Sequence, residues 1–203
     1  MVMKPDHYAD IELSGKSIPA IAAKVVQRLH PFMSEHKDTY ALAFPGIRVG
    51  MESGEQPRIG GCVRLFANSR EAIEQALDHL EIGIVSGSDF VTEKQLSPLI
   101  HIGRVRKVPD DYDGTWVTYH RFRIPSRRGK SEQHQEKRLK LRSRRLQESR
   151  VLPYLILQSA STRQTFSLII QSQEHKVGTG ITGILDGYGF SSKEAPVYLP
   201  SLQ

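Results

Sequence analysis

The sequence predicts an α+β fold, with a ferredoxin-like βαββαβ unit followed by a smaller α+β region. In the first half, short apolar segments alternate with two segments of helical periodicity. In the second half, short strand-like segments flank a long basic helix over residues 131–149. A turn-rich stretch, Pro109–Gly114, separates the halves. We therefore expect an N-terminal ferredoxin-like domain over residues 1–110 and a smaller C-terminal domain with the basic helix over residues 111–203.

The first two elements follow from alternation and from helical spacing. Tyr8–Leu13 alternates apolar and polar residues, as a half-buried strand does. Residues 18–36 are predicted to form an amphipathic helix, with Ser17 as its N-cap and Pro19 in its first turn. The residues that recur on one face of this helix are Ile21, Val25, Leu29 and Phe32.

The remaining elements of the first half are two strands, a helix and a last strand. Residues 40–44 and 62–66 are short apolar strands, interrupted by turn residues. Ser69 caps a second helix whose apolar face comprises Ile73, Ala76, Leu77 and Leu80. Residues 99–108 are predicted to form one strand, and residues 81–98 are interpreted as an insertion.

The second half begins with a strand over residues 116–123 and ends with a hairpin. The helix over residues 131–149 starts at Ser131, and only Leu139 and Leu146 form an apolar stripe on it. So narrow a stripe is typical of a helix that faces a polyanion rather than a core. Residues 155–157 and 166–170 are predicted strands around the turn at residues 159–163.

Charge is concentrated in one segment. The formal net charge is +6, but residues 121–150 hold 12 Lys or Arg and three Glu, a local charge of +9. This asymmetry favours a nucleic-acid partner over a merely solvated face or an acidic membrane or protein surface. The single cysteine, the absence of a signal-like start and the lack of a long apolar run predict a cytoplasmic protein without disulfides.

Motifs for cofactors and metals do not fit their required context. Residues 178–183 match G-x-G-x-x-G, but the helix and the later acid that a dinucleotide site needs do not follow. We interpret this segment as a loop. The eight histidines lack ligand spacing, so neither a metal site nor a cofactor is expected.

The order of several short motifs resembles one known family. The motifs are Leu29-His30, Ala43-Phe44-Pro45, Arg121-x-Arg123 before the basic helix, Gln158-Ser159-Ala160-Ser161-Thr162, Phe166-x-Leu168-x-Ile170 and Tyr188-Gly189-Phe190-Ser191. Together they resemble the Csy family, the type I-F CRISPR repeat-processing endoribonucleases. The resemblance covers most of the chain. The segments 81–98 and 171–184 look longer than in the family, which suggests a divergent or transposon-associated branch.

The resemblance implies an activity and a set of partners. The family cleaves CRISPR precursor RNA at the base of the repeat hairpin, leaving a 2′,3′-cyclic phosphate and a 5′-hydroxyl. The enzyme then stays on the stem-loop as a subunit of the type I-F surveillance complex. Arg121 and Arg123 match the positions that read purines in the hairpin, although family members carry Gln at the second. This departure changes which bases we expect to be read.

The resemblance also assigns candidate roles near the cut. His30 is the candidate general base, because imidazole titrates near neutrality and needs no metal. Ser159 is expected to orient the attacking 2′-hydroxyl, with Ser161 as the alternative. Tyr188 is expected to hydrogen-bond His30, and Phe166 to stack on the terminal base pair. Each position also has an ordinary structural interpretation, as a helix-end, turn or core residue.

Basic side chains are expected to contact phosphates along the stem. Arg138, Arg142 and Arg145 lie on one line of the helix. The other candidate RNA-binding residues are Arg127, Arg128, Lys130 and Lys137. Two alternatives remain at this point: a non-catalytic, ferredoxin-like RNA-binding module of a ribonucleoprotein, and a catalytically inactive family member that serves only in assembly.

Overall fold

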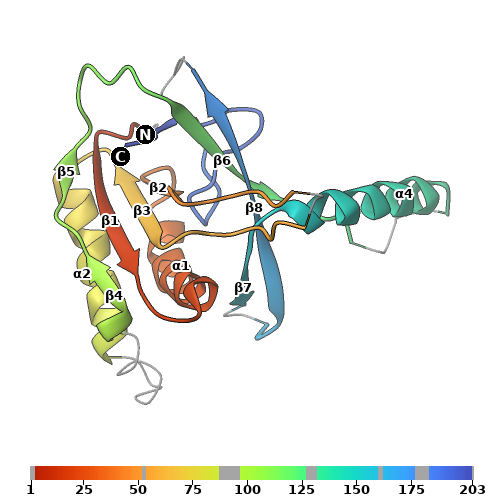
Figure 1. The fold of residues 1–203 in the computed structure, drawn as a ribbon, viewed down its shortest axis with the longest axis horizontal. Helices are drawn as coiled ribbons and strands as arrows, with labels where there is room; N and C mark the ends of the chain where they lie inside the picture. Colours follow the sequence, from red (N-terminus) through yellow and green to blue (C-terminus); the bar gives the residue numbers. More distant parts are fainter. Residues whose placement is uncertain are drawn as a thin grey trace.

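The computed structural model describes residues 3–51, 54–86, 97–126, 132–159, 162–176 and 183–202. Within these ranges the chain forms three α-helices and two antiparallel sheets, which confirms the predicted α+β class (Figure 1). No helix in the described part of the chain is long and apolar enough to cross a membrane.

The first sheet is built by strands from the first half of the chain. Its main strands are β1 (His7–Leu13), β2 (Tyr40–Ala43), β3 (Cys62–Ala67) and β4 (Ile100–Ile102), in the order β2-β3-β1-β4. All the strand pairs are antiparallel. The element order β1-α1-β2-β3-α2-β4 matches the βαββαβ prediction and is compatible with a ferredoxin-like unit.

Two amphipathic helices connect these strands. Helix α1 (Ile18–Glu35) begins after Ser17 as predicted, although the Ser17 side chain makes no capping hydrogen bond. Helix α2 (Arg70–Ser86) is N-capped by Ser69, whose hydroxyl accepts a hydrogen bond from the Ala72 N–H at 3.2 Å. The predicted apolar face of α2, Ile73, Ala76, Leu77 and Leu80, is buried throughout. Residues 81–86, predicted as the start of an insertion, instead continue this helix.

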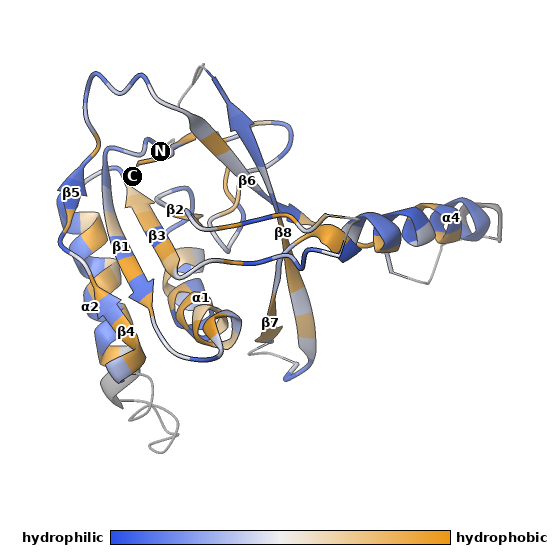
Figure 2. Cartoon of the chain, in the orientation of Figure 1, coloured by the Kyte–Doolittle hydropathy of each residue, from blue (hydrophilic) through white to orange (hydrophobic). Residues whose placement is uncertain are grey.

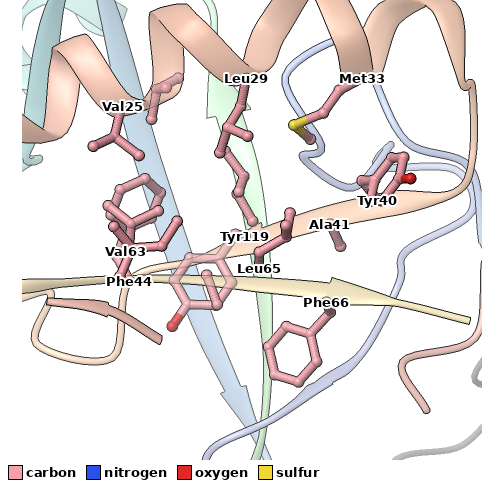
Figure 3. Packing of buried hydrophobic residues seen from close by; sticks show 14 of the residues in the cluster. Val25, Leu29, Met33, Tyr40, Ala41, Phe44, Val63, Leu65, Phe66 and Tyr119 are labelled. Atoms are coloured by element: carbon pink, nitrogen blue, oxygen red, sulfur yellow. The ribbon is translucent and has the colours of Figure 1, made fainter. Parts of the chain in front are cut away.

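The larger of two hydrophobic clusters in the described residues contains side chains from both halves of the chain. Val25, Leu29 and Met33 point from α1 toward the strands of the first sheet (Figure 3). Tyr119, from the second half, packs in the same cluster. Burial of one such aliphatic side chain contributes about 1.5–3 kcal/mol. The helix that carries His30 is therefore held firmly against the sheet.

The predicted strand over residues 99–108 is split in two. Strand β4 ends at Ile102, and β5 (Arg106–Lys107) resumes pairing with β1. Three residues of this strand, 103–105, face two residues of β1, so one extra residue forms a bulge. A Cβ atom at Gly103 would lie 3.1 Å from the Asp10 carbonyl oxygen, so the two backbones approach closely there. The continuous-strand prediction was wrong because alternation cannot reveal a bulge.

The second sheet comprises β6 (Trp116–Phe122), β7 (Tyr154–Gln158), β8 (Thr165–His175) and β9 (Leu199–Pro200), in the order β7-β8-β6-β9. The pairing of β7 with β8 confirms the predicted hairpin. The edge strand β7 packs against α1. The Gln27 side chain donates a hydrogen bond to the Gln158 carbonyl at the end of β7, so the β7–β8 turn lies beside the middle of α1.

Helix α4 (Glu132–Glu148) projects away from the rest of the molecule and is largely hydrophilic (Figure 2). Leu139 and Leu146 remain 42% and 41% exposed, so their stripe does not pack against the body. The arginine face turns inward instead, and Arg142 and Arg145 are only partly exposed. Guanidinium groups can bind backbone carbonyls that leucines cannot, so the arginines rather than the leucines contact the preceding chain.

Candidate active site and RNA-binding surface

His30 lies near the C-terminal end of α1 and is held by a carbonyl group. Its Nδ1 lies 2.7 Å from the Gly187 carbonyl oxygen, which can only accept a hydrogen bond. Nδ1 therefore carries the proton, and Nε2 carries the lone pair that a general base needs. The Ser34 hydroxyl, one helical turn further on, lies 3.1 Å from Nδ1 and donates to the Gly187 oxygen at 3.3 Å.

The turn that supplies this carbonyl is organised by Asp186. One Asp186 carboxylate oxygen accepts hydrogen bonds from the Tyr188 N–H at 2.9 Å and the Phe190 N–H at 3.1 Å. A Cβ atom at residue 187 would lie 3.0 Å from the Ser34 hydroxyl oxygen and 3.3 Å from His30 Cε1. Glycine at position 187 thus permits the close approach of this turn to α1.

Tyr188 contacts His30 differently from the predicted hydrogen bond. The two rings are stacked, with centroids 3.8 Å apart and planes inclined by 7°. The imidazole Nδ1–H instead donates its hydrogen bond to the neighbouring Gly187 carbonyl. Burial raises the pKa of the Tyr188 hydroxyl above its usual value. The phenol therefore remains protonated at neutral pH.

Phe166 and Arg121 complete a cluster on the same side. The Phe166 ring, at the start of β8, lies 6.3 Å from the Tyr188 ring in an edge-on arrangement. The Arg121 guanidinium carbon lies 5.6 Å from the Phe166 centroid and 5.4 Å from the Tyr188 centroid. Arg121 shares a strand face with Tyr119, as the alternation predicts. Both arene–guanidinium distances are within the range of cation–π contacts.

Ser159 lies at the turn between β7 and β8. Its hydroxyl oxygen accepts a hydrogen bond from the Thr162 N–H at 3.3 Å, and its own N–H donates to the Gln164 carbonyl at 2.9 Å. The preceding carbonyl, of Gln158, accepts a hydrogen bond from the Gln27 side chain at 3.2 Å. Because Gln27 lies one turn before His30, this bond connects the Ser159 turn to the histidine-bearing helix.

The predicted arginine line on α4 faces the end of β6. Arg138 donates to the Ser126 carbonyl at 3.0 Å and to the Ser126 hydroxyl at 2.9 Å. Arg142 donates to the Pro125 carbonyl at 2.5 Å. The Arg145 guanidinium lies 4.4 Å from the centroid of the Phe122 ring. These three arginines therefore fasten α4 to the chain that precedes it.

The opposite face of α4 presents exposed cations to solvent. Lys137, Lys140 and Arg144 fall on this face, about half a helical turn from the arginine line. Lys140 pairs with Glu136 at 2.8 Å and Arg144 with Glu148 at 3.4 Å, both as exposed i,i+4 pairs. Such exposed pairs contribute little to stability and exchange readily with another anion.

Some predicted residues are separate from the cluster or outside the described ranges. Arg123 is exposed and lies just beyond the end of β6. The predicted residues Arg127, Arg128, Lys130 and Ser161, the predicted cap Ser131, and most of the glycine-rich segment 178–183 lie outside the described residues. Within the described part of the chain, no group of three or more His, Cys, Asp or Glu is placed to hold a metal ion.

Sequence reasoning missed Ser34, Gly187 and the Gln27–Gln158 contact. Ser34 stands four residues after His30, a spacing that places two side chains on one helix face. The four-residue spacing could therefore have predicted a contact between Ser34 and His30. The Gln27–Gln158 and His30–Gly187 contacts join residues far apart in the chain, and no local sequence pattern predicts them.

The described residues combine an α+β scaffold, an oriented histidine, a cluster of Arg121 with two aromatic rings and a projecting basic helix, and the basic helix suits a polyanionic partner. A family profile described as CRISPR-associated protein (Cas_Csy4) matches residues 8–200, and the chain belongs to this family. A search of curated proteins finds no match. Family membership supports a role in processing CRISPR repeat RNA, as an RNA-binding endonuclease.

Proposed function

We propose that this chain cuts CRISPR precursor RNA at the base of the repeat hairpin, without a metal ion, and then stays bound to the stem-loop in a type I-F surveillance complex. The nucleophile is the 2′-hydroxyl next to the scissile phosphate. The observation that carries the proposal is the hydrogen bond from His30 Nδ1 to the Gly187 carbonyl, because it leaves Nε2 as a base.

The chemistry at His30 is proton transfer. Nε2 takes the proton of the 2′-hydroxyl while O2′ bonds to phosphorus and the bond from phosphorus to the 5′-oxygen breaks. The products are a 2′,3′-cyclic phosphate and a 5′-hydroxyl, whose proton comes from solvent or from the new imidazolium. A positioned general base typically contributes about 10²–10⁴-fold to the rate.

Ser159 is proposed to hold the 2′-hydroxyl in line with the phosphorus atom. Its turn is connected to α1 through the Gln27–Gln158 hydrogen bond, so the serine and the histidine belong to one framework. Positioning of this kind can supply a large part of a rate enhancement. Ser161, in the same turn of the sequence, is the alternative for this role.

The last base pair of the stem is proposed to rest on Phe166. Arg121 lies close enough to the Phe166 ring to contact the edge of the same base pair. Phe166 would then stack on the base pair next to the cut, and Arg121 would read the edge of the same pair. Arg123, just beyond β6, is proposed to read the stem further along.

Phosphate contacts along the stem are proposed for the basic helix and the segment before it. Lys137 belongs to the exposed face of α4, and Arg127 and Arg128 precede the helix in sequence. The arginine line of Arg138, Arg142 and Arg145 was predicted to track phosphates as well. In this structure two of its members bind backbone carbonyls, so RNA would have to displace those bonds.

The proposal is tested with a labelled cognate hairpin in excess EDTA. Cleavage should be complete with an all-ribose hairpin and should stop when the nucleotide before the cut carries 2′-deoxyribose. The deoxy hairpin should still bind, because its phosphates and stem are unchanged. Cutting of the deoxy hairpin, or a requirement for metal, would reject the mechanism. Tight binding with no cleavage of either RNA would indicate a non-catalytic RNA-binding subunit.

A further inference from the structure

A groove runs along the N-terminal half of α1. A cavity of about 650 Å³ lies between α1 and the edge strand β7, with residues 56–59 of the β2–β3 loop on a third side. Figure 1 shows the loop between β2 and β3 extending toward the start of β7. The polar and aromatic side chains that line it include Lys24, Gln27, Tyr154 and Gln158.

A second cavity, of about 480 Å³, continues this groove past the start of α1. The two cavities share Pro19, Pro57 and Ile59, so they adjoin beside the start of α1, and together they are called the groove. Arg48 and Arg58 line the second cavity on facing segments of the β2–β3 loop. Two backbone hydrogen bonds, of 2.8 and 2.9 Å, hold these segments together. Lys16 lines the same cavity from the start of α1.

The lining of both cavities carries one sign of charge. It includes four cations, Lys16, Lys24, Arg48 and Arg58, and no acidic residue. All four side chains are exposed, and none forms a salt bridge with an acid in the described ranges. A groove lined in this way attracts a polyanion.

The inner end of the groove lies beside the candidate active site. Gln27 and Gln158 line the groove and are hydrogen-bonded to each other. His30 lies one helical turn beyond Gln27, and Ser159 directly follows Gln158. A strand that leaves the scissile phosphate would therefore reach this opening first.

An exposed aromatic side chain adds a surface for a base. Tyr154 is 48% exposed and lines the groove opposite α1. A cationic groove with an aromatic platform is the usual construction of a single-strand binding site. From Lys16 to Gln27 the groove follows α1 for roughly 16 Å, which is room for a few nucleotides.

We infer that this groove, formed by Lys16, Lys24, Arg48, Arg58 and Tyr154, binds the single-stranded RNA on the 3′ side of the cut. The inference rests on the proposed cleavage next to His30. At the base of the stem, the RNA strand that enters from the 5′ side is separated from the cut strand by the width of the duplex. The groove opens at the cut itself, so it matches the 3′ strand.

The test compares hairpins with a single nucleotide and with about six nucleotides beyond the cut, a length within the usual range of single-strand sites. Binding is measured in EDTA with 2′-deoxyribose before the cut, and cleavage is measured separately with all-ribose RNA. The wild-type protein should bind the longer RNA about tenfold more tightly. Its salt dependence should be steeper by about 0.7 for each additional phosphate contacted.

The Arg48→Ala/Arg58→Ala variant should bind the two RNAs equally. Arg104→Ala/Arg106→Ala removes the same charge from exposed residues at and before β5, and should keep the tenfold difference. Lys24→Ala should reduce the difference in part. As a control, the RNA is lengthened on the 5′ side instead. Any resulting change in affinity should be the same for the wild-type protein and for Arg48→Ala/Arg58→Ala.

Two results would overturn the inference: equal binding of both RNAs by the wild-type protein, or a length effect that survives in Arg48→Ala/Arg58→Ala. Failure of the proposed cleavage would look different. It would appear as uncut all-ribose RNA, or as a metal requirement, whatever the length of the flank. Thermal unfolding of each variant excludes loss of the fold as the cause.

Discussion

The rings of His30 and Tyr188 lie parallel, with their centroids 3.8 Å apart. The stack and the Gly187 carbonyl together hold the imidazole, so the tyrosine ring matters more for orientation than its hydroxyl. We predict that Tyr188→Phe keeps cleavage within a few-fold of wild type, whereas Tyr188→Ala loses at least about tenfold, since misplacement of a catalytic group is costly. Single-turnover rates at saturating protein measure this difference. An equal loss in both variants would assign the role to the hydroxyl.

His30→Ala should separate cleavage from binding. The general base contributes about 10²–10⁴-fold to the rate, whereas affinity depends on the basic residues elsewhere. We expect the cleavage rate to fall by that factor while the Kd for the cognate hairpin changes little. Undiminished cleavage by His30→Ala would remove this residue from the mechanism.

Asp186 should act on cleavage through the shape of its turn. Asp186→Ala leaves the N–H groups of Tyr188 and Phe190 without their acceptor and releases the turn that holds His30. Losing these acceptors should lower the free energy of unfolding by about 1–3 kcal/mol. Cleavage should fall with it.

Asp186→Asn is the matched control, because it keeps an oxygen at the accepting position. It should retain most of both stability and activity. Urea unfolding and single-turnover rates measure the two effects. Equal loss in Asp186→Asn and Asp186→Ala would show that the charge, rather than the hydrogen bonds, is required.

The two faces of α4 should respond differently to loss of charge. Lys137→Ala/Lys140→Ala removes exposed cations, and should weaken hairpin binding and lower its salt slope by about 0.9 for each lost phosphate contact. Arg138→Ala/Arg142→Ala removes the bonds to Pro125 and Ser126. Loss of these bonds should increase proteolysis of the segment that connects β6 to α4.

Limited proteolysis and salt titrations distinguish these variants. If Arg138→Ala/Arg142→Ala changes the salt slope alone and leaves the proteolysis pattern unchanged, the arginine line acts as a phosphate contact. If Lys137→Ala/Lys140→Ala leaves binding unchanged, the exposed face of α4 does not contact the hairpin.

Most elements of the fold could be predicted because their patterns are local. The apolar spacing in α1 and α2 and the alternation in β6 identified where these elements begin, although α2 runs six residues further than predicted. The bulge between β4 and β5 could not be predicted, because it depends on the register against β1. The contacts of α4 could not be predicted either, because they are arginine hydrogen bonds to backbone carbonyls rather than leucine packing.

For the candidate site, the residues could be predicted but the contacts between them could not. The family resemblance singled out His30, Ser159, Tyr188, Phe166 and Arg121. The structure gathers His30, Tyr188, Phe166 and Arg121 into one cluster, and the Gln27–Gln158 bond joins the Ser159 turn to α1. Their roles in catalysis and base reading stay predictions.

The sequence by itself determined the α+β class, the placement of most helices and strands, and the concentration of positive charge in residues 121–150. These properties follow from spacing along the chain and from composition. Only the tertiary structure decided the tautomer of His30, the stacking of Tyr188 and the groove beside β7. The physical reason is distance along the chain: the Gly187 carbonyl meets His30 across 157 residues, and no local periodicity encodes such a contact.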